Sequence, residues 1–151
     1  SSALFCAHQL IERGEIELPL FVETLNQNDL KMHERKSVLS SLQKIETIQI
    51  SNLLIAYGRS GPNESIVSSS LVRAGADIAL CYRPVEHGTR ITCRARHRAI
   101  SIGVHLGDIC QHLAKSRGGE GGGHAGASGW TTELIGNVAV NAILDEIGRR
   151  Y

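Results

Sequence analysis

Aromatic side chains are scarce in this 151-residue chain, at 4% of its residues, with a single tryptophan, Trp130. A nucleic-acid surface built on base stacking therefore has few platforms here. Trp130 is the best candidate, with packing under the following helix as the alternative. No apolar run approaches the roughly 20 residues that span a bilayer, and no signal-peptide pattern opens the chain. We therefore expect a cytoplasmic protein without membrane contact.

The sequence also lacks a large excess of one charge sign, closely spaced cysteine pairs and clusters of carboxylates. The net charge is only +1, so affinity for an anionic partner has to come from a local patch. The four cysteines form no CxxC pair, which indicates reduced thiols rather than a disulfide framework or a zinc site. Four scattered aspartates offer no ligand cluster for a hard divalent metal. Because the chain begins at Ser1 and has one methionine, Met32, we expect a fragment of a longer protein or a processed one.

The sequence pattern changes near residue 47. Upstream, apolar spacing predicts helices over residues 3–11 and about 29–44, with a break over Gly14–Pro19. We assign residues 1–46 to a helical linker or to the end of a preceding domain, with simple core packing of these helices as the alternative.

Residues 47–151 alternate strand and helix patterns. This order predicts an α/β domain with a mixed β-sheet flanked by helices. The turn chemistry of Pro84–Thr89 indicates a hairpin connection, and Thr131 or Thr132 is placed to cap the last helix. The predicted elements are a strand over 48–57, a turn over 58–63, a helix over 64–73, strands over 76–82 and 90–96, a helix around 106–113, a glycine loop, an optional short strand and a helix around 135–143.

The strand predicted over Arg90–Arg96 concentrates positive charge. A period of two places Ile91, Cys93 and Ala95 on its buried face and Arg90, Thr92, Arg94 and Arg96 on the other. Like charges on one sheet face repel, so an anionic partner would stabilise them, and guanidinium groups match phosphate with two parallel donors. Arg94 and Arg96 are therefore candidate phosphate-binding residues, with a solvated exposed face as the alternative.

Glycine is concentrated in one place. Seven of the 16 glycines lie within residues 118–129, and one histidine lies among them. Dense glycines permit positive φ and let backbone N–H groups approach an anion, while a histidine adds a donor. The run has no serine repeat and lies between two helical patterns, which favours a ligand loop over a flexible linker. The candidate ligand-binding residues of the run are Gly121, Gly122, Gly123, His124 and Gly129.

These residues also carry a family resemblance. The stretch 121–129, GGGHAGASG, closely resembles the GGGHxxAAG signature of the DHH-associated domain, with Ser128 at a usual alanine. Residues 91–95, ITCRA, are similar to the family pattern I-S-x-R-S, with Arg94 on its arginine and Ala95 at the second serine. This domain is the C-terminal half of DHH-family phosphoesterases, and the present chain looks most like archaeal RecJ-like proteins from about residue 48 onward.

The resemblance implies a division of labour. An N-terminal DHH domain would hold manganese or magnesium and hydrolyse a phosphodiester, while residues 47–151 hold the substrate. The GGGH loop would bind phosphate or sugar. His124 would contact a phosphate near the metals, and Arg94 would bind a second phosphate. The implied partners are single-stranded DNA or RNA, oligonucleotides or dinucleotides, and the chain's own DHH domain. This chain has no Asp-His-His triplet, so we expect no catalytic residue in it, and substrate binding without hydrolysis.

Two other functions stay open. The chain also resembles the C-terminal domain of alanyl-tRNA synthetases, which would make it a non-catalytic RNA-binding domain. The histidine after three glycines favours the phosphoesterase branch. The third possibility is a protein-interaction or regulatory domain whose glycine loop has lost its ligand.

Overall fold

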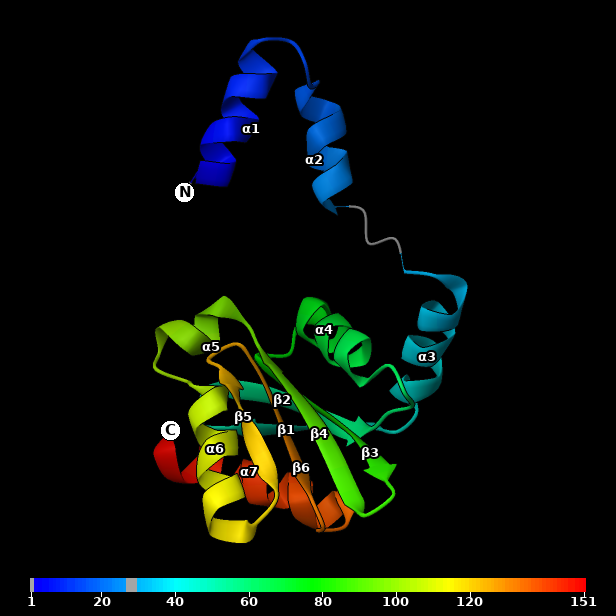
Figure 1. Ribbon diagram of the computed structural model, residues 1–151, viewed down its shortest axis with the longest axis vertical. Coiled ribbons are helices and arrows are strands. Elements are labelled where there is room, and N and C mark those ends of the chain that lie inside the picture. The colour runs from blue at the N-terminus through cyan, green and yellow to red at the C-terminus, as the bar shows by residue number, and fades with distance from the viewer. Residues whose placement is uncertain (1, 27–29) are drawn as a thin grey trace. The chain divides into compact units, whose positions relative to one another are not determined.

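Six β-strands form one mixed sheet in the computed structural model, which describes residues 2–26 and 30–151 (Figure 1). The strands are β1 (Ile45–Ile50), β2 (Leu53–Arg59), β3 (Ile78–Val85), β4 (Gly88–Ala95), β5 (Glu120–His124) and β6 (Ala127–Thr132), and their order is β1-β2-β3-β4-β6-β5. The helices are α1 (Ser2–Glu12), α2 (Leu18–Asn26), α3 (Met32–Leu42), α4 (Glu64–Ala74), α5 (His97–Ser101), α6 (Leu106–Arg117) and α7 (Gly136–Arg150). The predicted α/β class with a mixed sheet flanked by helices is confirmed.

Helix α4 is the reason that the sheet is mixed. It connects β2 to β3, which are parallel, whereas every other strand pair is antiparallel. A parallel pair requires a crossover of this kind. Residues 78–81 of β3 are fully buried, as expected for a central strand that is covered on both faces.

Different helices cover the two faces of the sheet. Helices α6 and α7 pack on one face, where the main core includes Ile91 and Trp130. Helix α4 covers the opposite face over β3 and β4, where Val67 packs with Ala79 and Cys81. Figure 1 shows α4 on one side of the sheet and α6 and α7 on the other. We refer to these two sides as the α4 face and the α6 face.

The single strand predicted over residues 48–57 is wrong, because these residues belong to a β-hairpin. Strands β1 and β2 pair antiparallel, with Ile48 opposite Ile55. The turn falls at Ser51 and Asn52, and Ser51 has a φ of +52°. Serine and asparagine are turn formers, but this turn contains no glycine or proline and lies between apolar residues on both sides. The continuous apolar character therefore concealed the turn.

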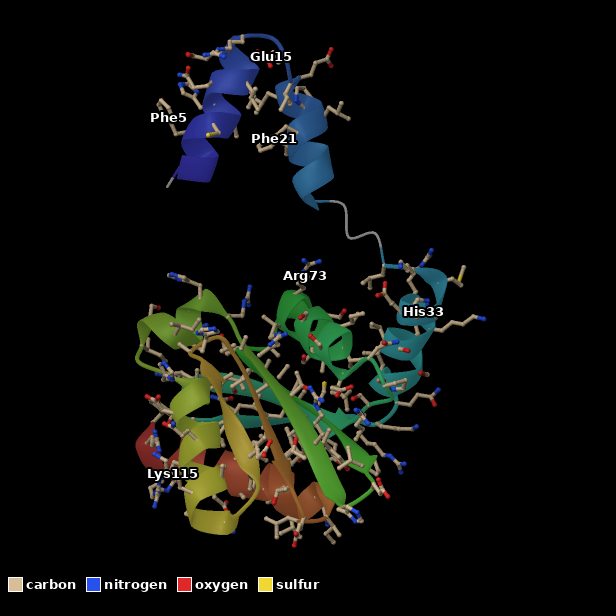
Figure 2. All side chains as sticks on the ribbon, in the orientation of Figure 1. Phe5, Glu15, Phe21, His33, Arg73 and Lys115 are labelled. Carbon is tan, nitrogen blue, oxygen red and sulfur yellow. The ribbon has the colours of Figure 1, made fainter. Side chains whose placement is uncertain are left out.

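The chain divides after Lys31 into two compact units, and α1 and α2 belong to the first. Helix α1 was predicted, but α2 was not. Pro19 lies in the first turn of α2, where the missing N–H would have no intrahelical acceptor, so the proline does not break the helix there. Within this unit, Phe21 of α2 points toward α1, whereas Phe5 points away from α2 and is 63% exposed (Figure 2).

Three other expectations about helices need correction. The helix predicted over 29–44 is α3, which is shorter, and Asp29 lies outside the described residues. Helix α5 was not predicted. Thr131 and Thr132 do not cap α7, because both belong to β6 and Ile135 precedes the helix without a side-chain capping bond. Over the described residues, no helix has both the length and the apolar character needed to span a membrane.

Candidate functional site

The arginine face predicted for β4 is present. Ile91 and Cys93 are fully buried on the α6 face, whereas Arg90 and Arg94 contact the first turn of α4 on the other side. The expectation that this row extends to Arg96 is wrong, because β4 ends at Ala95. Arg96 is instead the extended residue before α5.

The glycine run is a β-hairpin rather than the predicted loop. Strands β5 and β6 pair antiparallel, and β6 is the short strand that the sequence left optional. Gly122 and Gly123 have φ values of +156° and +136°, which residues with a side chain rarely adopt. Gly121 lies against α6, where a Cβ would be only 2.5 Å from the carbonyl oxygen of Cys110. Backbone conformation and close helix packing therefore both require glycine here.

Strand register places the arginine motif and the glycine motif on the same face. Residues paired directly across an antiparallel ladder lie on one side of the sheet. Arg94 pairs with Ala127 of β6, which in turn pairs with His124 of β5. Gly129 pairs with Gly122, and each lies two residues along its strand from that pair, so these two glycines lie on the same face. Residues that the sequence singled out separately thus meet on the α4 face.

A pocket of about 570 Å³ opens on this face. It lies between the start of α4, the arginines of β3 and β4, and the glycines of the β5–β6 hairpin. Its lining residues are Pro62, Asn63, Glu64, Ser65, Ile66, Arg83, Arg90, Thr92, Arg94, Gly122, Gly123, Ala127, Ser128 and Gly129. Arg94, Gly122, Gly123 and Gly129 were predicted as site residues; Gly121, His124 and Arg96 are not among the lining residues.

The first turn of α4 adds a positive backbone dipole to the pocket. Asn63 at the N-cap position makes no side-chain capping bond, and its Nδ2 instead donates to Ser37 Oγ at 2.9 Å. The first N–H groups of a helix lack intrahelical acceptors and form the positive end of its dipole. Glu64 and Ser65, which begin α4, both line the pocket. The helix start therefore adds to the attraction for an anion.

The charges lining the pocket are unequal. Three arginines and one glutamate give the lining a net charge of +2. Glu64 pairs with Arg83 and Arg90, with Nε–Oε1 distances of 3.1 and 3.4 Å. Arg94 pairs with no carboxylate in the described part of the chain, and its Nη2 donates to Ser65 Oγ at 2.8 Å. Arg94 is thus a guanidinium whose charge is left for a ligand.

His124 and Trp130 lie in contrasting places. His124 is exposed at the end of β5, beside the pocket rather than in its wall. Trp130 is 1% exposed on the α6 face, and its Nε1 donates to the carbonyl of Gly118 at 3.1 Å. The packing alternative for Trp130 is therefore correct, and this ring offers no stacking surface for a base.

Comparison with known proteins places this geometry in a family. Residues 52–150 match the DHHA1 domain. The chain belongs to the DHHA1 domain family. This is the domain found in DHH phosphoesterases, so the coarse resemblance drawn from the glycine and arginine motifs is confirmed.

This chain is similar in sequence to one protein of known sequence and similar in fold to two solved structures. The uncharacterized protein MJ0988 of Methanocaldococcus jannaschii is 32% identical over 116 residues, which cover 76% of this chain and 35% of that protein. The DHHA1 chain therefore spans about a third of the length of this relative.

Among solved structures, the PF0399 DHH domain, described as a member of the S1P family of ribosomal proteins, has a TM-score of 0.60 at 16% identity, covering 78% of this chain and 30% of that one. The C-Ala domain of alanyl-tRNA synthetase from Aquifex aeolicus has a TM-score of 0.54 at 10% identity, covering 69% of this chain and 96% of that one. At identities this low, the structural similarity shows a shared fold and nothing more.

DHH-family phosphoesterases are metal-dependent. Across the described residues of this DHHA1 domain, no group of three His, Cys, Asp or Glu side chains is placed to hold a metal ion. The pocket supplies arginines, backbone amides and one carboxylate that is already paired. Its chemistry suits an anion rather than a cation.

Sequence reasoning missed the contribution of α4 and β3 to this DHHA1 pocket. Glu64 begins the helix predicted over residues 64–73, but the sequence gives no reason to place Glu64, Ser65 or Arg83 in the site. Glu64 and Arg83 are far apart in sequence, and they meet only because α4 crosses over the sheet between β2 and β3. No spacing rule within one element could have found this contact.

Proposed function

We propose that this protein is the substrate-binding C-terminal domain of a DHH-family phosphoesterase or RecJ-like exonuclease. It holds phosphates of single-stranded nucleic acid, oligonucleotides or dinucleotides for hydrolysis by a DHH domain of the parent protein. Residues 47–151 form the binding domain, and residues 1–46 lead to it from the catalytic part. The required manganese or magnesium is held by that DHH domain, and this chain alone binds without cleaving.

The unpaired charge of Arg94 is the observation that carries this proposal. A guanidinium that no carboxylate of the described residues neutralises lies beside the start of α4 and lines the same pocket as the glycines of the hairpin. Gly122 and Gly129 place no side chain over this part of the pocket, so a phosphate can approach the backbone closely. Arginine, helix dipole and bare backbone together are suited to a phosphodiester. His124 lies on the same face and would contact a neighbouring phosphate.

Binding of a labelled five-nucleotide single strand, as DNA and as RNA, tests the proposal. We expect saturable binding that weakens about tenfold to a hundredfold in Arg94→Ala, because one charge-assisted contact is lost. We expect no cleavage with manganese present. Equal binding by the wild type and Arg94→Ala would contradict the proposed site. A manganese-dependent nuclease activity that disappears in His124→Ala would overturn the assignment of catalysis to another domain.

The fold shared with the alanyl-tRNA synthetase C-Ala domain supports a second candidate. In that case the domain would bind a folded RNA without taking part in hydrolysis. Competition between a tRNA and a single strand of matched length distinguishes the two. A clear preference for the single strand supports the phosphoesterase proposal, and a clear preference for the folded RNA supports the second candidate.

A further inference from the structure

Glu64 is a buried carboxylate in the wall of the pocket. Its side chain is 8% exposed, and its Oε1 accepts from Arg83 Nε at 3.1 Å and lies 3.4 Å from Arg90 Nε. A charge taken out of water requires partners, so these two arginines account for the burial of Glu64. The same oxygen serves both guanidinium groups, which ties strands β3 and β4 to the start of α4.

The contacts with Glu64 use the inner nitrogen of each arginine. A guanidinium carries five donors in a rigid fork, and fixing Nε fixes the plane of the whole group. Both arginines line the pocket, and their side chains are 34% and 55% exposed. Within residues 2–26 and 30–151, no oxygen accepts a hydrogen bond from their outer Nη nitrogens. These nitrogens are therefore the donors left for a ligand.

Strand register makes Glu64 necessary for this arrangement. Arg83 and Arg90 pair directly across β3 and β4. Like charges in directly opposed positions destabilise a sheet and would turn the two side chains apart. One carboxylate between them offsets the repulsion and holds both groups at the pocket. Arg94 and Ser65 lie beside them, since Ser65 follows Glu64 in α4.

We propose that Glu64 is a positioning residue, which holds Arg83 and Arg90 as a second phosphate-binding position beside the one formed by Arg94 and Ser65. This inference rests on the proposed function, because it concerns the same pocket. It assigns the ligand two neighbouring phosphates rather than one. It also gives an acidic residue a favourable role in binding an anion.

The direction in which one substitution changes the binding affinity tests this role. Glu64→Gln removes a negative charge from the pocket, so simple electrostatics predicts tighter binding of the five-nucleotide single strand. A positioning role predicts the opposite, because the released arginines turn away. We expect about fivefold to tenfold weaker binding, and a slope of log affinity against log salt that is about 0.7 smaller, as for one lost phosphate contact on a single strand. Circular dichroism and thermal unfolding establish that the variant is folded.

Glu86→Gln is the matched control. Glu86 is highly exposed in the β3–β4 turn, and its Oε1 lies 4.0 Å from His87 Nε2. The substitution changes net charge by the same amount, and we expect binding equal to or slightly tighter than that of the wild type. If Glu64→Gln behaves like Glu86→Gln, with an unchanged salt slope, Glu64 only neutralises charge and the inference is wrong.

Arg90→Gln keeps the test decisive if Glu64→Gln does not fold. Arg90 is more than half exposed, so its loss should leave the fold intact, and we expect the same reduction in salt slope. An unchanged slope in Arg90→Gln refutes the second phosphate position. These results are separable from the proposed function itself: a wild-type chain that binds no single strand overturns both proposals, whereas normal wild-type binding with a sensitive Arg94→Ala leaves the function standing.

Discussion

Gly107 of α6 lies directly against the carbonyl group of Gly123 in β5. A Cβ on Gly107 would be 2.2 Å from that oxygen and 2.6 Å from its carbon. The two backbones therefore approach each other without any side chain between them. Since Gly123 is also a lining residue of the pocket, this contact fixes the position of one pocket wall relative to the helix behind it.

Replacing Gly107 with alanine tests this close approach. The added methyl group has to displace backbone, so we expect the free energy of unfolding to fall by about 1–3 kcal/mol, despite the better helix propensity of alanine. Urea unfolding provides the measurement. Gly61→Ala is the control, because a Cβ there meets no atom within 4 Å, and its effect should stay within about 0.5 kcal/mol. Equal stabilities for the two variants would show that the α6–β5 contact can adjust.

The ion cluster around Glu146 predicts a loss of stability in acid. Burial raises the pKa of Glu146. Its hydrogen bond with Arg150 and the charges of Arg150, Arg149 and His112 lower the pKa by more than burial raises it, so the pKa lies below the usual value. A carboxyl group whose pKa is lower in the folded state stabilises the protein above its unfolded pKa, near 4.3, and loses this contribution as the pH falls through the folded pKa.

Urea unfolding of the wild type and Glu146→Gln at pH 7, 5 and 3 measures this contribution. We expect the wild type to be more stable at pH 7 and the difference between the two proteins to shrink at pH 3. A difference that stays constant over this range would mean that the charge of Glu146 is not what stabilises the α6–α7 contact.

Thiol reactivity provides a test of burial. Cys81, Cys93 and Cys110 are buried, whereas Cys6 is exposed. Burial, assisted by the nearby charge of Glu64, raises the pKa of Cys81 to about 12. Because the thiolate is the reactive form, iodoacetamide at pH 8 should modify one thiol in the folded protein and all four after unfolding, as counted by mass spectrometry. A Cys6→Ser variant should then show no modification while folded, and rapid labelling of that variant would contradict the buried positions.

Fluorescence of Trp130 should report on the core rather than on the ligand. The ring is buried on the α6 face, opposite the pocket. We expect an emission maximum at short wavelength, weak quenching by acrylamide, and little change when a single strand binds. Unfolded protein serves as the reference for an exposed ring. Strong quenching by a bound oligonucleotide would place the nucleic acid on the wrong face of the sheet.

The sequence predicted those features that one strand or helix encodes by itself. The alternation in β4 revealed a buried face and an arginine face, and the glycine and arginine motifs predicted the family. The prediction failed at the β1–β2 turn, where Ser51 interrupts an apolar run without glycine or proline. It also failed for the glycine run, because glycines carry no side-chain period from which a strand can be recognised.

The candidate site was only half predictable for a different reason. Arg94 and Gly129 belong to motifs, but the contacts of Glu64 with Arg83 and Arg90 arise from the packing of a crossover helix against two strands. Arg96 lies outside the pocket wall, because the strand ends one residue earlier than its charge pattern. Local pattern fixes which side chains share a face, whereas tertiary packing decides which of them meet.

The sheet order has a consequence for how the pocket assembles during folding. Strand β6 lies between β4 and β5, although β5 comes first in the chain. Among the described strands, β5 pairs only with β6, so it cannot join the sheet before β6 has docked on β4. Pairing across long sequence separations is slow because loop closure costs entropy before any contact forms. The arginines of the pocket are carried by the β3–β4 hairpin and its glycines by the β5–β6 hairpin, so the pocket is complete only when these two hairpins pair through β4 and β6.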